Sequence, residues 1–232
     1  HQTMREKQSE GVVNRQRGKV AAKSRSSVTK PSLTPMTAQH RLRGAPRQVR
    51  IIGGQWKRTP LQVPDVAGLR PTPDRVRETL FNWLQHLRPD VSTLRGLDLF
   101  AGTGALGFEL ASRGARSVLL VESNPQALQS LRATCERLAA TAVEVRSGDG
   151  LSVAAALAPG SFDVIFLDPP FDAGLQGPAL AAARRLLAAG GLLYLETPTA
   201  LAPDEARQDG LEIVRGGRAG QVSFHLLRQP SA

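Results

Sequence analysis

Short apolar runs alternate with helical patterns from about residue 96 onward, and this alternation restricts the fold more than any other feature. The runs that read as buried strands are 96–100, 117–121, 143–146, 162–167 and 192–196. The helical patterns between them cover 105–113, 124–139, 151–157 and 179–188. Strands that alternate with helices predict a mostly parallel sheet covered on both faces, so we expect a doubly wound α/β fold. Residues 211–215 and 222–227 are expected to close the sheet as an antiparallel pair.

The net charge of +10 lies at one end of the chain. Residues 1–50 hold 12 Lys or Arg against two acids, and because the whole chain has 30 and 20, the remainder holds 18 of each. A segment this polar cannot bury enough apolar surface to offset chain entropy, so we expect residues 1–45 to form a disordered basic tail. The tail is either an arm that attracts RNA phosphates or a solvated extension without a role.

Cysteine and histidine usage excludes several classes of protein. Cys135 is the only cysteine, so an intrachain disulfide is impossible and a reducing cytoplasm fits. The four histidines are scattered and predict no zinc site. No apolar run is long enough to span a membrane. We expect a cytoplasmic monomer without a metal ion or a membrane partner.

Residues 46–90 are expected to form a hairpin and a helix in front of the main domain at 91–232. Two short strands, 50–56 and 60–64, are separated by a turn that carries Lys57 and Arg58. Thr72 is the expected N-cap of the following helix, with Pro73 at its first position.

A glycine loop, GTGALG at 102–107, follows the first strand of the main domain. This spacing suits a close backbone approach to a ligand at a helix N-terminus, and it serves several cofactors. Asp98 precedes the loop, and Glu122 ends the second strand, where a carboxylate can accept ribose hydroxyls. Asp149 and Gly150 follow the third strand, where a carboxylate can accept an adenine amino group. Asp98 would repel a diphosphate, which favours S-adenosylmethionine over a nicotinamide cofactor.

The fourth strand ends in Asp168-Pro169-Pro170-Phe171. The carboxyl ends of parallel strands border the ligand crevice, so Asp168 is expected to face the methyl donor. An exocyclic amine is a poor nucleophile, and a carboxylate and a carbonyl that accept its two N–H groups would aim its lone pair. The prolines direct a carbonyl inward, and Phe171 is expected to stack on the base.

With these motifs the chain resembles the family of bacterial 16S ribosomal RNA guanine-N2 methyltransferases whose target nucleotide is named guanine 966. The likeness covers about residues 49–228 and is carried by the stretches RIIGGQW at 50–56, LRPT at 69–72, DRVRE at 74–78, FN at 81–82, FAG at 100–102, DPPF at 168–171 and AGQV at 219–222.

The resemblance implies the seven-stranded, Rossmann-like fold of class I methyltransferases with an N-terminal hairpin and helix. It implies that Asp168 and its prolines hold the guanine amine, that residues 70–72 close over the methionine end of S-adenosylmethionine, and that 16S rRNA in the small subunit is the substrate. The expected cofactor residues are Arg70, Thr72, Asp98, Phe100, Ala101, Gly102, Gly104, Glu122, Asp149 and Gly150.

Basic residues of the N-terminal part are expected to hold RNA phosphates as a rim around an unstacked loop. They are Arg50, Lys57, Arg58, Arg75 and Arg77. For each arginine the alternative is a solvated or helix-pairing charge.

Three other functions fit parts of the pattern. One is methylation of another base, either adenine-N6 in DNA or a different rRNA guanine. The second is a nicotinamide-dependent oxidoreductase, although no hydride-transfer constellation is evident. The third is an inactive RNA-binding or assembly factor, against which the intact DPPF motif argues.

Overall fold

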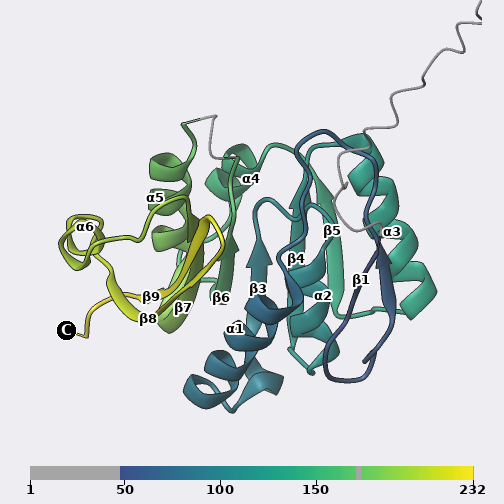
Figure 1. Ribbon diagram of the computed structural model, residues 1–232, viewed down its shortest axis with the longest axis horizontal. Coiled ribbons are helices and arrows are strands. Elements are labelled where there is room, and N and C mark those ends of the chain that lie inside the picture. Colours follow the sequence, from purple (N-terminus) through teal and green to yellow (C-terminus); the bar gives the residue numbers. More distant parts are fainter. Residues whose placement is uncertain (1–47, 171–173, 232) are drawn as a thin grey trace, which may run out of the picture. The chain divides into compact units, whose positions relative to one another are not determined.

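The computed structural model describes residues 48–170 and 174–231, which belong to one compact unit. A seven-stranded sheet runs through this unit in the order β5-β4-β3-β6-β7-β9-β8 (Figure 1). Neighbours from β5 to β7 are parallel, and β9 is antiparallel to both β7 and β8. The strands are β3 Arg95–Asp98, β4 Ser117–Glu122, β5 Val143–Ser147, β6 Phe162–Leu167, β7 Leu187–Thr197, β8 Glu212–Ala219 and β9 Val222–Arg228. The predicted parallel sheet with an antiparallel closing pair is confirmed.

Six α-helices cover the two faces of the sheet within the described residues. They are α1 Asp74–Leu87, α2 Ala105–Ser112, α3 Pro125–Leu138, α4 Gly150–Ala156, α5 Gln176–Leu186 and α6 Pro203–Gln208, with a 3-10 turn at Val91–Thr93. Helix α6 was not predicted. Asn124 caps α3 as expected, since its side chain accepts the N–H groups of Gln126 and Ala127.

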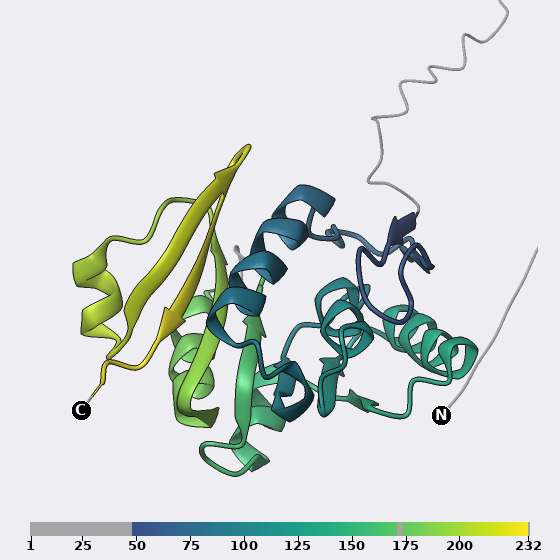
Figure 2. The same ribbon diagram turned by 90° about the horizontal axis from the view of Figure 1, so that it is seen from below.

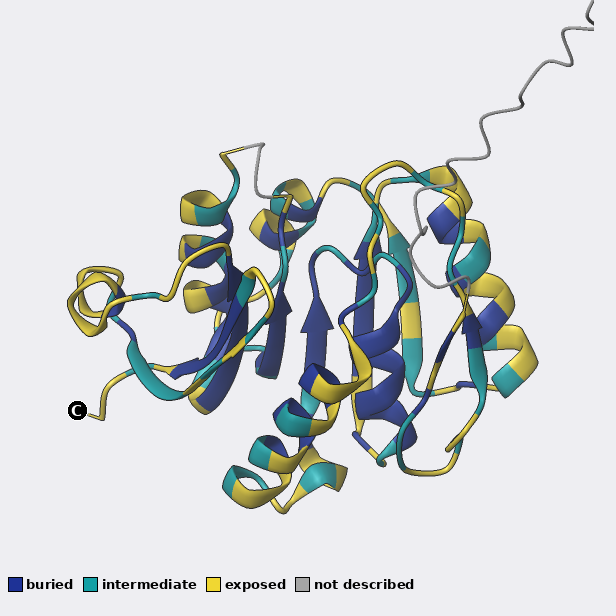
Figure 3. Ribbon diagram, in the orientation of Figure 1, coloured by how far each residue is buried: buried dark blue, intermediate teal, exposed yellow. Residues whose placement is uncertain are grey.

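Alternate residues of the strands point to opposite faces and produce two hydrophobic cores. Phe166 and Tyr194 belong to the core beneath α1 and α2, whereas Leu167 and Leu195 belong to the core beneath α5. Figure 3 shows the central strands buried and the helices buried mainly along the sides that face them. No helix of residues 48–170 and 174–231 has the length and apolar character needed to cross a membrane.

Helix α1 follows the N-terminal hairpin and packs against the antiparallel β8–β9 pair at one edge of the sheet. Figure 2 shows it beside the β8–β9 pair, where the rings of Trp83 and Phe224 stack with centroids 5.4 Å apart. The predicted N-cap is wrong: Pro73 occupies the cap position without a side-chain bond. The Thr72 hydroxyl donates to Glu196 Oε1 instead, at 3.0 Å.

The N-terminal hairpin exists, but its first strand was predicted too far along the chain. Strand β1 covers Gln48–Arg50 and pairs with β2, Pro60–Gln62. Residues 51–59 form the connection, because their polar backbone groups bind α2: the N–H of Gln55 donates to the carbonyl of Ser112 at 2.7 Å. Gly54 has φ +79°, and a Cβ there would lie 2.0 Å from that carbonyl oxygen, so only glycine fits.

A buried carboxylate on α2 holds the connection in place. Glu109 is fully buried and accepts the backbone N–H groups of Ile52 and Gly53, each at 2.8 Å. It also pairs with Arg113 at 3.0 Å and with Arg77 of α1 at 3.4 Å. Because residues 48–90 share these contacts with α2, they pack onto the sheet domain within one unit. The predicted division at residue 90 stays a prediction, and the predicted tail at 1–45 lies outside the described residues.

We predict that Glu109→Gln destabilises the protein by about 3–5 kcal/mol, because it removes the buried charge that pairs with Arg77 and Arg113 and turns one acceptor of a backbone N–H into a donor. The free energy of unfolding in urea measures this. Asp204→Asn is the control: Asp204 pairs with Arg207 on α6 and both side chains are largely exposed, so its loss should cost less than about 1 kcal/mol. Equal costs for the two variants would contradict the role of Glu109.

Candidate active site

Four acidic residues stand at the carboxyl ends of four neighbouring parallel strands. Glu122 ends β4, Asp98 ends β3, Asp168 directly follows β6, and Glu196 is the second-last residue of β7. The strand order β4-β3-β6-β7 therefore places them in a row along one edge of the sheet. In the parts of the chain that the structure describes, no Lys or Arg lies within ion-pair distance of these four carboxylates.

This row of carboxylates borders a cavity of about 940 Å³. The cavity is also lined by residues 66–73, which precede α1, and by Ala219, Gln221 and Val222 at the tip of the β8–β9 pair. Further lining comes from Gly102, Thr103, Ala105 and Leu106 of the glycine loop and from the prolines after Asp168. The cavity has the position expected for the ligand crevice of a doubly wound sheet, outside the carboxyl ends of the strands.

The glycine loop fits closely against the cavity wall. Gly102 has φ +57°, and a Cβ there would lie 2.8 Å from the side chain of Leu69. Its N–H donates to Glu122 Oε2 at 2.8 Å, while Oε1 accepts the N–H groups of Ser123 and Asn124. Three backbone donors thus hold the Glu122 carboxylate at the edge of the cavity, where it can still accept hydroxyl groups from a ligand.

Burial and mutual repulsion make two of the carboxyl groups weak acids. Burial raises the pKa of Asp98 to about 7. The hydrogen bond from the Phe100 N–H lowers this pKa, and the charges of Glu122 and Glu196 raise it. Burial, followed by the charges of Glu196 and Asp98 and a hydrogen bond with Glu196, raises the pKa of Asp168 to about 8. The cavity therefore holds protons near neutral pH and would favour a cationic ligand, which lets the acids ionise.

Glu196 was missed by the sequence reasoning. Its Oε1 accepts the hydroxyl groups of Tyr194 at 2.6 Å and Thr72 at 3.0 Å. The residue lines the cavity and is 7% exposed. A usable signal was present, because Glu196 ends a buried parallel strand as Asp168 does, and the same argument from strand ends applies to both.

Most of the predicted cofactor residues line the cavity. They are Arg70, Thr72, Asp98, Phe100, Ala101, Gly102 and Glu122. Gly104 is not among the lining residues: it has φ +77°, and a Cβ would meet Phe108 and Leu131, so it serves packing. Asp149 is exposed and caps α4 by accepting the N–H and the hydroxyl of Ser152, both at 2.9 Å. Gly150 packs against the Leu99 carbonyl, 2.5 Å from where a Cβ would stand. Contact of these three residues with a cofactor stays a prediction.

The predicted methyl-transfer motif, residues 168–171, follows β6, between the acids at the ends of β3 and β7. Asp168, Pro169 and Pro170 all line the cavity. Phe171 lies outside the described residues, so its stacking role stays a prediction.

The five predicted RNA-binding residues do not form one rim. Arg77 was predicted wrongly as a rim residue: it is fully buried, and its guanidinium binds Glu109, Asp74 and the carbonyls of Arg50 and Thr72. Its guanidinium makes four hydrogen bonds inside the protein and has no exposed surface, so a phosphate cannot reach it. Arg50 donates to the carbonyl of Arg58 at 2.9 Å and remains exposed, as does Arg75.

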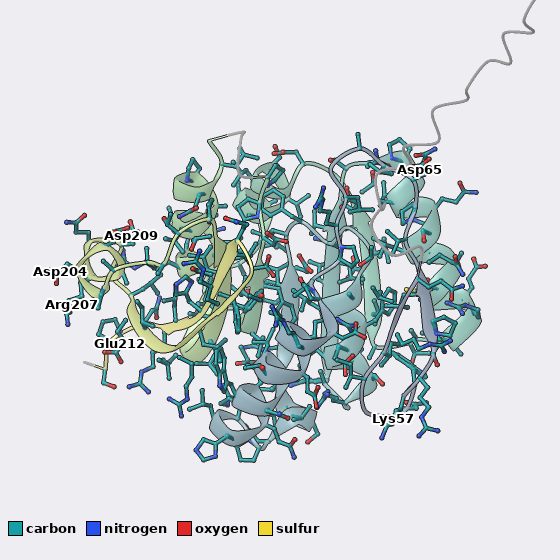
Figure 4. The ribbon with its side chains drawn as sticks, viewed as in Figure 1. Lys57, Asp65, Asp204, Arg207, Asp209 and Glu212 are labelled. Carbon is teal, nitrogen blue, oxygen red and sulfur yellow. The ribbon has the colours of Figure 1, made fainter. Side chains whose placement is uncertain are left out.

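Lys57 and Arg58 are exposed but lie far from the cavity. Residues 55 and 56 bind Ser112, the last residue of α2, whereas α2 begins at the glycine loop. An eight-residue helix is about 12 Å long, so the turn lies near the amino ends of the strands. Figure 4 shows Lys57 at the end opposite to that toward which β3 points in Figure 1.

Comparison with known proteins agrees with this arrangement. A sequence family described as conserved hypothetical protein 95 matches residues 49–228. The chain belongs to this family. The matched region runs from β1 to the last residue of β9, so the hairpin, α1 and the whole sheet are part of what the family shares.

Three relatives show the extent of the similarity. Ribosomal RNA small subunit methyltransferase D of Escherichia coli (strain K12) is 38% identical over 191 residues, or 78% of this chain and 90% of that protein. The protein of the same name from Haemophilus influenzae is 39% identical over 155 residues, or 65% and 79%. The solved structure of yhhF from Escherichia coli is 35% identical with a TM-score of 0.66, and covers 78% of this chain and 98% of that one. The Rossmann-like fold of class I methyltransferases, expected from the sequence, is confirmed.

We predict that the free energy of unfolding falls as pH rises from about 4 to about 8. An Asp carboxyl with an ordinary pKa of 3.8 loses its proton in the unfolded chain over this range, while folded Asp98 and Asp168 keep theirs until about 7 and about 8. Between the unfolded and folded pKa values the folded state binds more protons than the unfolded state. The stability that the two protonated carboxyl groups contribute at low pH is therefore lost as pH rises through their folded pKa values. Asp168→Asn should flatten the dependence in urea titrations at pH 5 and pH 8.5.

Asp163→Asn serves as the control on the same strand. Hydrogen bonds and charge from Arg95 outweigh burial and lower the pKa of Asp163, so its contribution is constant above pH 5 and is lost only as pH falls below that range. This variant should lose stability by a constant amount between pH 5 and pH 8.5. An Asp168→Asn profile parallel to that of the wild type would contradict the assignment.

Proposed function

We propose that this protein transfers a methyl group from S-adenosylmethionine to the exocyclic N2 amine of a guanine in 16S rRNA of the small ribosomal subunit. The observation that carries the proposal is the row of carboxylates, with Asp168-Pro169-Pro170 in its centre, along one cavity at the carboxyl ends of the strands. Relatives at 38% and 39% identity bear the name ribosomal RNA small subunit methyltransferase D, which supports the substrate.

The charges along the cavity suit S-adenosylmethionine. When bound, this cofactor supplies an activated methyl group on a positively charged sulfur, and its methionine end carries an ammonium and a carboxylate. We assign Asp98 to the ammonium, Glu122 to the ribose hydroxyls and Arg70 to the carboxylate, since all three line the cavity. The two phosphates of a nicotinamide dinucleotide would meet the same acids and be repelled, so the oxidoreductase alternative is disfavoured.

Asp168 and the carbonyl of Pro169 are assigned to the two N–H groups of the guanine amine. Holding both N–H groups would aim the nitrogen lone pair at the methyl group that the bound cofactor would supply. The alkylated amine then releases one proton, for which the Asp168 carboxylate is the assigned acceptor. The chain's contribution is alignment, because the donor is already activated.

Labelled methyl transfer to small subunits from a strain that lacks the modification tests the proposal. We expect N2-methylguanine in 16S rRNA, identified by mass spectrometry of its nucleosides, and less transfer to naked 16S rRNA. Methyladenine, or a methylguanine at a different atom, would replace the proposed acceptor. Binding of NAD but not of S-adenosylhomocysteine in calorimetry would overturn the cofactor.

We predict that Asp168→Ala lowers methyl transfer by about 10²-fold or more, because it removes an acceptor needed to align the amine. Affinity for S-adenosylhomocysteine, measured by calorimetry, should stay within about threefold, which an effect of less than about 1 kcal/mol on binding would give. Asp163→Ala is the matched control: it lies at the other end of β6, where it pairs with Arg95. Full activity of the Asp168 variant would refute the assigned role.

We predict that replacing both Lys57 and Arg58 with Ala raises the KM for small subunits and leaves kcat unchanged. Both side chains are exposed and remote from the cavity, so their contribution is limited to attraction of phosphates. The slope of log KM against log salt concentration should fall by about one for each phosphate that the double variant no longer binds. Arg207→Ala, on exposed α6, is the control, and an unchanged KM in the double variant would remove the hairpin turn from the RNA-binding surface.

A further inference from the structure

Glu196 lies beside Asp168 at the edge of the sheet. Leu167 and Leu195 are register partners of β6 and β7, and each acid is the next residue along its strand. Both acids line the cavity, and the parallel register places them side by side at its edge. The two residues therefore present a pair of carboxyl groups to whatever enters this part of the cavity.

The Glu196 carboxyl group is held in one orientation. Two hydroxyl groups donate to its Oε1, from Tyr194 within β7 and from Thr72 before α1. Tyr194 is fully buried and Thr72 is 7% exposed, so neither donor is free to follow a moving carboxyl group. A carboxylate that accepts two hydroxyl bonds at one oxygen retains acceptor capacity at the other.

The row of carboxylates extends to both sides of Asp168. Glu122 and Asp98 lie on one side of Asp168, at the ends of β4 and β3 beside the glycine loop, and Glu196 lies on the other side. If the cofactor occupies the glycine-loop side, Glu196 is the acid farthest from it. It is thus next to the acceptor base rather than the cofactor.

We propose that Glu196 accepts the N1–H of the target guanine while Asp168 accepts its N2–H, so that the pair of carboxylates selects guanine. The assignment rests on the proposed function and names the residue that determines its base specificity. The Watson–Crick edge of guanine has two neighbouring donors, N1–H and the N2 amine, which match two carboxylate acceptors. Adenine has a lone pair at N1, which a carboxylate repels, so a site built this way rejects it.

The competing role is structural, because Glu196 also ties Thr72 to the sheet. A purely structural residue would affect every acceptor base alike. The base analogue 2-aminopurine separates the two roles: it keeps the N2 amine of guanine but has a lone pair in place of N1–H and a hydrogen in place of O6, which the Glu196 substitution leaves untouched. Small subunits reconstituted with 2-aminopurine at the mapped target nucleotide provide this probe.

Wild-type protein should prefer guanine over 2-aminopurine by about 10- to 100-fold in kcat/KM, the range expected for one hydrogen bond to a charged group. Glu196→Gln should reverse much of this preference, because the side-chain amide can still accept the two hydroxyl bonds but now offers an N–H to the N1 lone pair. Its activity on guanine should fall by a similar factor, while its activity on 2-aminopurine holds or rises. Affinity for S-adenosylhomocysteine should be unchanged.

Two further variants keep the test decisive. Tyr194→Phe removes one of the two donors that orient the Glu196 carboxyl group, so it should weaken the preference for guanine without reversing it. Glu196→Asp retains a carboxylate and should retain the preference for guanine. An equal loss on both bases in Glu196→Gln would overturn the assignment while the proposed function stands. If the wild-type protein forms no N2-methylguanine on unmodified subunits, the proposed function fails and the assignment with it.

Discussion

The buried ion pair between Glu109 and Arg77 is the interaction on which the N-terminal half of the structure depends. A carboxylate and a guanidinium without solvent contact are tolerated only when their hydrogen-bonding capacity is used. Glu109 uses it on the backbone of residues 52 and 53, and Arg77 on the carbonyls of Arg50 and Thr72. One pair thereby joins the hairpin, α1 and α2. Through Thr72, whose hydroxyl reaches Glu196, the same pair reaches the wall of the cavity.

The row of carboxylates differs from this ion pair, because it places like charges next to one another and does not stabilise the fold. Four acids line one cavity, and the raised pKa values of Asp98 and Asp168 show that at least two of them resist ionisation there. Such arrangements are expected at binding sites, where a ligand supplies the missing partner. A cofactor with a sulfonium and an ammonium, together with a base that offers two N–H donors, would supply it. The geometry and the proposed chemistry are thus two aspects of the same charge balance.

Predictions from the sequence succeeded where the controlling interactions are local. The run 162–167 is β6 to the residue, and Asn124 caps α3, because apolar patterning and capping act within a few residues along the chain. They failed where a distant group competes for the backbone or the side chain. Residues 51–56 have the composition of a strand, yet Glu109 and Ser112 take their N–H groups. Arginine is a residue type that is usually exposed, yet Arg77 is buried because a carboxylate on another helix pairs with it.

By itself the sequence determined the α/β class, the glycine loop, and the acids at the ends of the strands, since each depends on which residues follow one another. Only the tertiary structure decided that Glu196 stands beside Asp168, because their proximity requires β6 and β7 to pair in parallel register although the two acids are 28 positions apart in sequence. It likewise decided that Lys57 lies away from the cavity, because the contacts of residues 53–56 with the end of α2 orient the turn. Pairing register and side-chain competition are properties of the folded chain, which no local pattern contains.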